Sequence, residues 1–119
     1  MPDVPHPLVH LELRTGNLAG ACSFYSRLLG WRPERVDVGA SHYFALDIGN
    51  GIDGGVVERE AERALWLPYV EVDDVGRTTE HAQLLGASVA VERREGSTGW
   101  RSVVATEAGG EIAFWQPKR

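Results

Sequence analysis

The chain has one cysteine among its 119 residues, so it cannot form an intramolecular disulfide. Cys22 lies in a predicted helix, where a small buried thiol is the usual case. No apolar run approaches the ~20 residues that a membrane-spanning helix requires. Residues 1–7 also lack the cationic segment and the apolar core of a secretory signal. We therefore expect a cytoplasmic protein with no membrane partner.

Positive charge is scarce. The chain has 12 Lys and Arg against 17 Asp and Glu, a formal net charge of −5 and an isoelectric point near 5.3. Nucleic-acid binding depends on Lys and Arg neutralising phosphates, so we expect no nucleic-acid partner. The glycine-rich phosphate-binding loop, the dinucleotide-binding glycine pattern and the Cys-x-x-Cys pair are also missing. These absences leave small-molecule binding or catalysis as the function classes to weigh.

The two halves of the chain resemble each other. A stretch beginning at His10 has a counterpart beginning at Leu67, and each leads into a helical segment that ends in Leu-Leu-Gly, at Gly30 and Gly86. We predict a single domain over residues 1–119, a common domain size, that contains two copies of one supersecondary unit. Two such copies would face each other across a shared cleft.

Apolar periodicity and turn residues predict the same β-α-β-β-β order in residues 8–58 and in residues 65–117. In the first module we expect a helix after Asn17 and strands over 8–13, 31–36, 41–48 and 55–58. In the second we expect a helix after Asp73 or Asp74 and strands over 67–72, 88–92, 100–106 and 111–116. The glycine pairs 54–55 and 109–110 are expected to form turns before the last strands, and residues 59–64 a charged linker.

Alternation along the strands predicts which side chains look into the cleft. His10 and Glu12 lie opposite the apolar Val9, Leu11 and Leu13, which should meet a helix. By the same reasoning the cleft side of the second module carries the residues Leu67, Tyr69, Glu111, Ala113 and Trp115, while Ile112 and Phe114 meet its helix.

Aromatic side chains are expected around the same cleft. Flat side chains with a polar edge suit a pocket for a planar or extended organic ligand. The predicted ligand-binding residues are Tyr69, Trp66, Trp100, Trp115 and, from a neighbouring strand, His42. Filling of the protein core is the competing interpretation of these aromatic residues.

The segments His10–Leu18, Phe24–Trp31, Trp66–Asp74 and Gly109–Pro117 resemble the vicinal oxygen chelate superfamily, which includes glyoxalase I, extradiol dioxygenases, fosfomycin-modifying enzymes and bleomycin-binding proteins. The resemblance covers nearly the whole chain. It implies an α+β fold in which two tandem βαβββ modules form a cup-shaped mixed sheet, with the helices on its outer face. It also implies a homodimer.

Catalytic members of this superfamily hold a divalent ion with His or Glu side chains near the start and end of each module. His10 matches the first of these positions, but the resemblance puts Leu67 and Ala113 at two others. The remaining position falls within 55–57, and Glu58 reaches it only if the register shifts by one residue. One ligand of four does not make a metal site, so we expect no metal and no cofactor, with an ion held through His10 as the disfavoured alternative.

Two hypotheses about function follow. In the first, the protein binds a small aromatic or amphipathic molecule without a metal, and His10 and Glu12 orient it. In the second, it is a lyase, an isomerase or a dioxygenase of this superfamily, with a non-standard metal site or metal-free acid–base chemistry by His10 and Glu12 as catalytic residues. A third interpretation of His10 is a hydrogen-bonded histidine on a partly buried strand.

Overall fold

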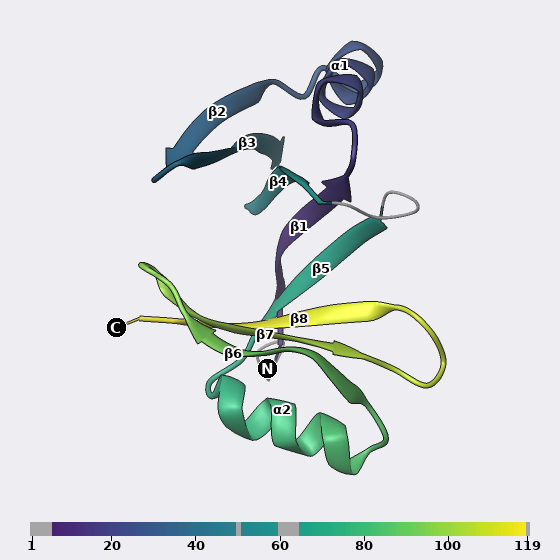
Figure 1. Cartoon of the computed structure of the whole chain (residues 1–119), viewed down its shortest axis with the longest axis vertical. Helices are drawn as coiled ribbons and strands as arrows, with labels where there is room; N and C mark the ends of the chain where they lie inside the picture. Colours follow the sequence, from purple (N-terminus) through teal and green to yellow (C-terminus); the bar gives the residue numbers. More distant parts are fainter. Residues whose placement is uncertain (1–5, 50, 60–64, 119) are drawn as a thin grey trace, which may run out of the picture. The chain divides into compact units, whose positions relative to one another are not determined.

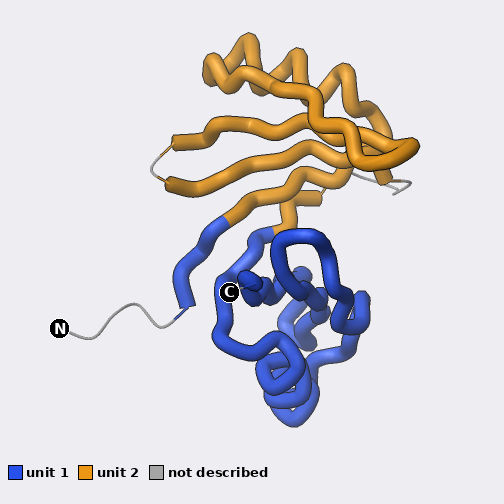
Figure 2. The backbone as a smooth tube through the Cα atoms, turned by 90° about the vertical axis from the view of Figure 1, so that its left-hand side faces the viewer, with its two compact units in different colours: residues 1–9, 68–119 blue, residues 10–67 orange. Residues whose placement is uncertain are grey.

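The structure is a computed structural model that describes residues 6–49, 51–59 and 65–118. It divides into two compact units (Figure 2). Residues 10–67, orange and labelled unit 2 in the figure, come first along the chain and are called the first unit here. Residues 1–9 with 68–119, blue and labelled unit 1, are called the second unit. Each is described here by itself. Most of the predicted linker, residues 60–64, lies outside the described residues.

The first unit is built on a sheet with strand order β2-β3-β4-β1 (Figure 1). β1 runs parallel to β4, and the other neighbours are antiparallel. Its elements are β1 (Leu8–Thr15), α1 (Leu18–Leu29), β2 (Pro33–Val38), β3 (Ser41–Gly49) and β4 (Ile52–Glu58). The predicted helix ends are confirmed: the Asn17 side chain accepts a hydrogen bond from the Gly20 amide at 2.9 Å, and Gly30 ends α1 with a φ of 75°.

The second unit repeats this pattern with strand order β5-β8-β7-β6 and parallel β5 and β8. Its elements are β5 (Leu65–Glu71), α2 (Val75–Leu84), β6 (Ser88–Glu95), β7 (Gly99–Ala105) and β8 (Glu111–Pro117). Asp74 begins α2 by accepting a hydrogen bond from the Arg77 amide at 3.0 Å. Neither helix in the described residues is long and apolar enough to cross a bilayer.

Each helix covers one face of its own sheet. In the first unit, Cys22 of α1 is buried in a cluster with Leu13, Leu46 and Val56. Burial raises the pKa of the Cys22 thiol, in agreement with its predicted core position. In the second unit, the fully buried Val75 fixes the start of α2. The face of each sheet that turns away from its helix is called the helix-free face below.

The glycine pair 54–55 is not a turn, which corrects that expectation. Both residues lie inside β4, where they pair with Leu46 and Ala45 of β3. A side chain on Gly54 would collide with Ile48, which packs on the core of the first unit. The pair at 109–110 does precede β8 with positive φ at both residues, as predicted. Close packing therefore explains the first pair, and turn geometry explains the second.

Candidate functional site

The helix-free face of the first unit is polar along β1. Because Leu13 packs into the core below α1, alternation places His10, Glu12 and Arg14 on the opposite face. The strand register puts Asp53 beside His10 and Gly55 beside Glu12. The sequence therefore predicted the orientation of His10 and Glu12 correctly.

The imidazole of His10 lies over Gly55. A Cβ atom built on Gly55 would come within 3.4 Å of the Nε2 atom of His10, so the glycine leaves room for the ring. Desolvation of the half-buried ring lowers the pKa of His10, while the carboxylates of Glu12 and Asp53 act in the opposite direction. The net downward shift favours the neutral imidazole near pH 7, a form that can accept a proton or a hydrogen bond.

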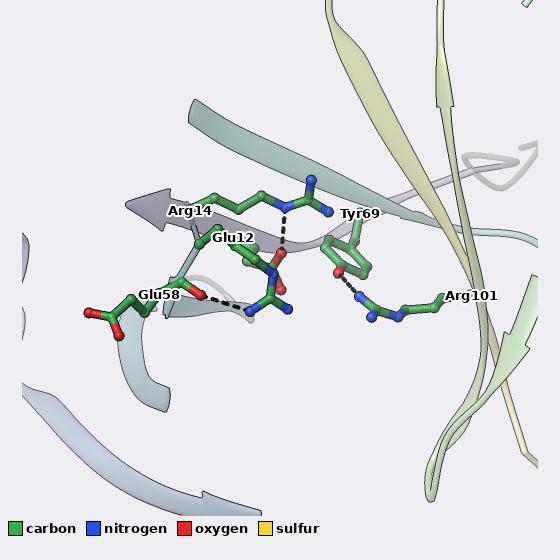
Figure 3. A network of polar contacts seen from close by, with 6 residues as sticks. Glu12, Arg14, Glu58, Tyr69 and Arg101 are labelled. Atoms are coloured by element: carbon green, nitrogen blue, oxygen red, sulfur yellow. Dashed lines mark hydrogen bonds and ion pairs between the residues drawn. The ribbon is translucent and has the colours of Figure 1, made fainter. Parts of the chain in front are cut away.

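Glu12 is buried, with an exposed fraction of 8%. The Nε atom of Arg14 donates a hydrogen bond to the Glu12 carboxylate at 3.1 Å (Figure 3). A buried carboxylate is costly without such a partner, so this ion pair compensates part of the cost. The sequence analysis missed Arg14, although the same two-residue spacing that relates His10 to Glu12 also indicates it.

The helix-free face of the second unit carries Tyr69, Arg101 and Trp115. The Ser102 hydroxyl lies 2.7 Å from the hydroxyl of Thr79 on α2, so the odd-numbered β7 residues around it face away from the helix. The register pairs Arg101 with Trp115. The Nη1 atom of Arg101 donates a hydrogen bond to the Tyr69 hydroxyl at 2.9 Å (Figure 3). Arg101 was also missed by the sequence analysis, because the strand register alone brings it to this face.

The donor atoms of this chain do not fit the metal site that the resemblance implies. Leu67 and Ala113 are buried, have no ligating side-chain atom, and thus offer no coordination at their positions. Glu58 aligns with Thr15 in the register, which places it on the α1 side of the sheet, opposite to His10. Within residues 6–49, 51–59 and 65–118, no group of three or more His, Cys, Asp or Glu could hold an ion.

Trp66 does not share a surface with Tyr69, which corrects the expected aromatic cluster. Its ring makes edge contacts with Tyr25 of α1, at 5.5 Å between ring centroids, and with Trp31, at 6.5 Å. Trp66 and Tyr69 are three residues apart on one strand, so they point to opposite faces. Trp66 thus belongs to the packing around α1.

Trp100 and His42 also lie on the helix sides of their sheets. Trp100 pairs with Gln116, whose side chain accepts a hydrogen bond from the Val75 amide of α2 at 2.9 Å. His42 contacts Phe44 edge to face at 5.8 Å and, beside the start of α1, lines a pocket of about 390 Å³. Neither residue joins Tyr69 and Trp115 on a helix-free face.

Solved structures with the same fold differ strongly from this chain in sequence. A hypothetical protein from Bacillus halodurans C-125 has a TM-score of 0.72 and 14% identity, with 96% of each chain covered. Methylmalonyl-CoA epimerase from Mycobacterium tuberculosis has a TM-score of 0.67 and 14% identity, with 94% of this chain and 88% of that chain covered. These similarities confirm the α+β fold of tandem βαβββ modules.

The family comparison identifies the chain more specifically. No curated protein sequence matches it. The model of the Glyoxalase/Bleomycin resistance protein/Dioxygenase superfamily matches residues 8–114, which is well over half of the chain. The resemblance found in the sequence is therefore confirmed, and the chain belongs to the Glyoxalase/Bleomycin resistance protein/Dioxygenase superfamily.

Proposed function

We propose that this protein binds a small aromatic or amphipathic organic molecule, and that it does so without a divalent metal. The observation that carries the proposal is the burial of Leu67 and Ala113, with exposed fractions of 2% and 0%, at positions where the superfamily resemblance implies metal ligands. Apolar side chains at these positions favour contact with an organic molecule over coordination of an ion.

The polar groups on the helix-free faces supply orientation. The neutral imidazole of His10 can accept a hydrogen bond from a ligand, and the Glu12 carboxylate can accept a second. Tyr69 and Trp115 offer aromatic surface, and Arg101 holds the Tyr69 hydroxyl in place. Within the second unit, aromatic surface next to the polar groups of Tyr69 and Arg101 is typical of small-molecule sites.

Tryptophan emission tests the binding proposal. Titration with a panel of aromatic and amphipathic metabolites should change the emission of the unaltered protein. Trp115→Phe should remove most of the response, whereas Trp100→Phe, the matched change on the α2 side of β7, should keep it. Equal responses in both variants, or no response to any compound, would contradict the proposal.

The alternative function is catalysis by an isomerase or lyase of this superfamily. The observation that favours it is the lowered pKa of His10, since a neutral imidazole beside a carboxylate can take up a proton from a substrate. Solved neighbours with the same fold include methylmalonyl-CoA epimerases, which makes an isomerase the first class to assay. His10→Gln should abolish turnover with the fold intact, and unchanged turnover in this variant would exclude the assignment.

The homodimer and the cytoplasmic location expected from the sequence stay predictions. Light scattering after size-exclusion chromatography tests the first, and cell fractionation tests the second. A monomeric mass at working concentration would contradict the homodimer.

A further inference from the structure

We propose that Arg101 is the binding site for the carboxylate of the ligand, so that the molecule bound by this protein is an organic acid. This inference rests on the proposed function and narrows it to one chemical class. It starts from a positive charge that has no carboxylate partner among the described residues.

Arg101 is half-buried and makes no ion pair with a carboxylate in the described part of the chain. Its guanidinium group donates one hydrogen bond there, from Nη1 to the uncharged Tyr69 hydroxyl at 2.9 Å. A guanidinium group has five N–H donors in a planar fork, so several remain for another acceptor. Charged groups that lose water on folding are ordinarily paired, which makes an anionic ligand the missing partner.

The immediate neighbours of Arg101 on the helix-free face carry no negative charge. The register places Arg94 directly across from Arg101 on β6 and Trp115 across from it on β8. Gly99 and Val103 flank it along β7 on the same face. None of these four neighbours is acidic, and Arg94 adds a second positive charge. In the same register row the first carboxylate is Glu71 on β5, one strand beyond Trp115.

Trp115 provides a flat surface on the strand that pairs with β7. A Cβ atom on Gly99 would lie 3.0 Å from the indole Nε1 of Trp115, so the ring occupies the space that the glycine leaves open. The ring is therefore held two residues along β7 from Arg101. A planar group with a carboxylate at one end could contact the indole and the guanidinium together.

A carboxylate suits this site better than a phosphate. Its two coplanar oxygens match the fork of a single guanidinium in a bidentate pair. The half-buried guanidinium of Arg101 balances the single charge of a carboxylate, whereas the second charge of a phosphate dianion would depend on the exposed Arg94. We therefore expect an aromatic or amphipathic acid.

Isothermal titration calorimetry with three probes of similar shape tests the inference: phenylacetate, the uncharged phenylacetamide, and benzylphosphonate. Phenylacetate should bind the unaltered protein about tenfold or more tightly than phenylacetamide. Arg101→Gln should lower the affinity for phenylacetate by about tenfold and leave the affinity for phenylacetamide within about twofold of that of the unaltered protein. The matched control is Arg35→Gln, which removes the same charge from an exposed pair with Asp37 on β2 and should leave both affinities unchanged.

Each outcome of the calorimetry either supports the carboxylate site or overturns it. Equal affinities for phenylacetate and phenylacetamide, or an unchanged phenylacetate affinity in Arg101→Gln, would overturn the carboxylate site but leave the proposed function standing. Tighter binding of benzylphosphonate than of phenylacetate would overturn the choice of carboxylate. If none of the three probes bound while a compound of the metabolite panel changed the tryptophan emission, the carboxylate site would be overturned and the proposed function would stand. If Arg101→Gln does not fold, the ratio of the phenylacetate and phenylacetamide affinities of the unaltered protein still tests whether the site binds a carboxylate.

Discussion

The hydroxyl oxygens of Thr79 and Ser102 lie 2.7 Å apart, and this contact joins α2 to β7 within the second unit. Both residues are buried, with exposed fractions of 7% and 0%. The Thr79 hydroxyl also donates to the carbonyl of Val75 at 2.6 Å, so it is held between the helix backbone and the sheet. The contact marks the helix side of β7, so the neighbouring odd-numbered side chains reach the helix-free face.

Thr79→Val should destabilise the protein by about 1–3 kcal/mol, because the variant keeps the shape of the side chain but leaves the Ser102 hydroxyl buried without its partner. Thr79→Val combined with Ser102→Ala should recover part of this loss, since both polar groups are then gone. Thr78→Val is the matched control on the more exposed neighbouring position. Urea unfolding measures all three, and strictly additive losses would contradict the pairing.

Gly99→Ala should destabilise the second unit by several kcal/mol. The new methyl group would collide with the backbone carbonyl of Gln116 and press on the Trp115 ring, and backbone atoms of a paired strand cannot move aside cheaply. Gly16→Ala is the control, because its nearest neighbour would be the Arg59 carbonyl at an ordinary 3.8 Å. Thermal unfolding followed by circular dichroism compares them, and similar midpoints would contradict the packing described for Trp115.

Arg14→Met and Arg35→Met provide a comparison of two ion pairs with similar geometry. Arg14 contacts buried Glu12 at 3.1 Å, while Arg35 contacts exposed Asp37 at 2.9 Å. Removing Arg14 should cost about 3 kcal/mol because it takes an ion-pair partner from a buried carboxylate, whereas removing Arg35 should cost less than about 1 kcal/mol. Denaturant unfolding at pH 7 measures the difference, and equal costs would show that Glu12 has access to water.

The stability of the protein should depend on pH through His10. The folded state lowers the pKa of His10 below the ordinary value of about 6.5, so the unfolded chain takes up this proton first as the pH falls. The free energy of unfolding should therefore decrease as the pH is lowered through about 6.5 and stop falling, for this group, below the folded-state pKa.

His10→Gln should flatten this part of the stability profile, measured by urea unfolding between about pH 5 and pH 8. His6→Gln is the matched control, because His6 is exposed near the start of the described chain. If both variants kept the slope of the unaltered protein, His10 would not be the responsible group.

The sequence predicted the faces of β1 and β8 because strict alternation determines them once one apolar residue is assigned to the helix side. The face on which His10 and Glu12 lie follows in this way from the position of Leu13, and the face of Trp115 follows from that of Phe114. Trp66 and Tyr69 are three residues apart, an odd number, so the same rule places their side chains on opposite faces. The prediction that Trp66 and Tyr69 share one aromatic cluster was wrong because it was based on residue type and not on the spacing of the two residues.

Other features need the strand register, which a single sequence does not contain. Trp100 and Trp115 lie on different strands, and only the pairing of Trp100 with Gln116 shows that they point to opposite faces. Arg101 reaches Tyr69 for the same reason. The glycines at 54 and 55 were misinterpreted because the packing of Ile48 and His10 that requires them comes from residues outside the pair.

Metal content of the freshly purified, untagged protein tests the central claim most directly, and inductively coupled plasma mass spectrometry measures it. The claim is that buried apolar side chains at Leu67 and Ala113 have replaced metal coordination with contacts to an organic ligand. We predict far less than one equivalent of any transition metal per chain. A full equivalent that survives dialysis and is lost in His10→Gln would contradict the account.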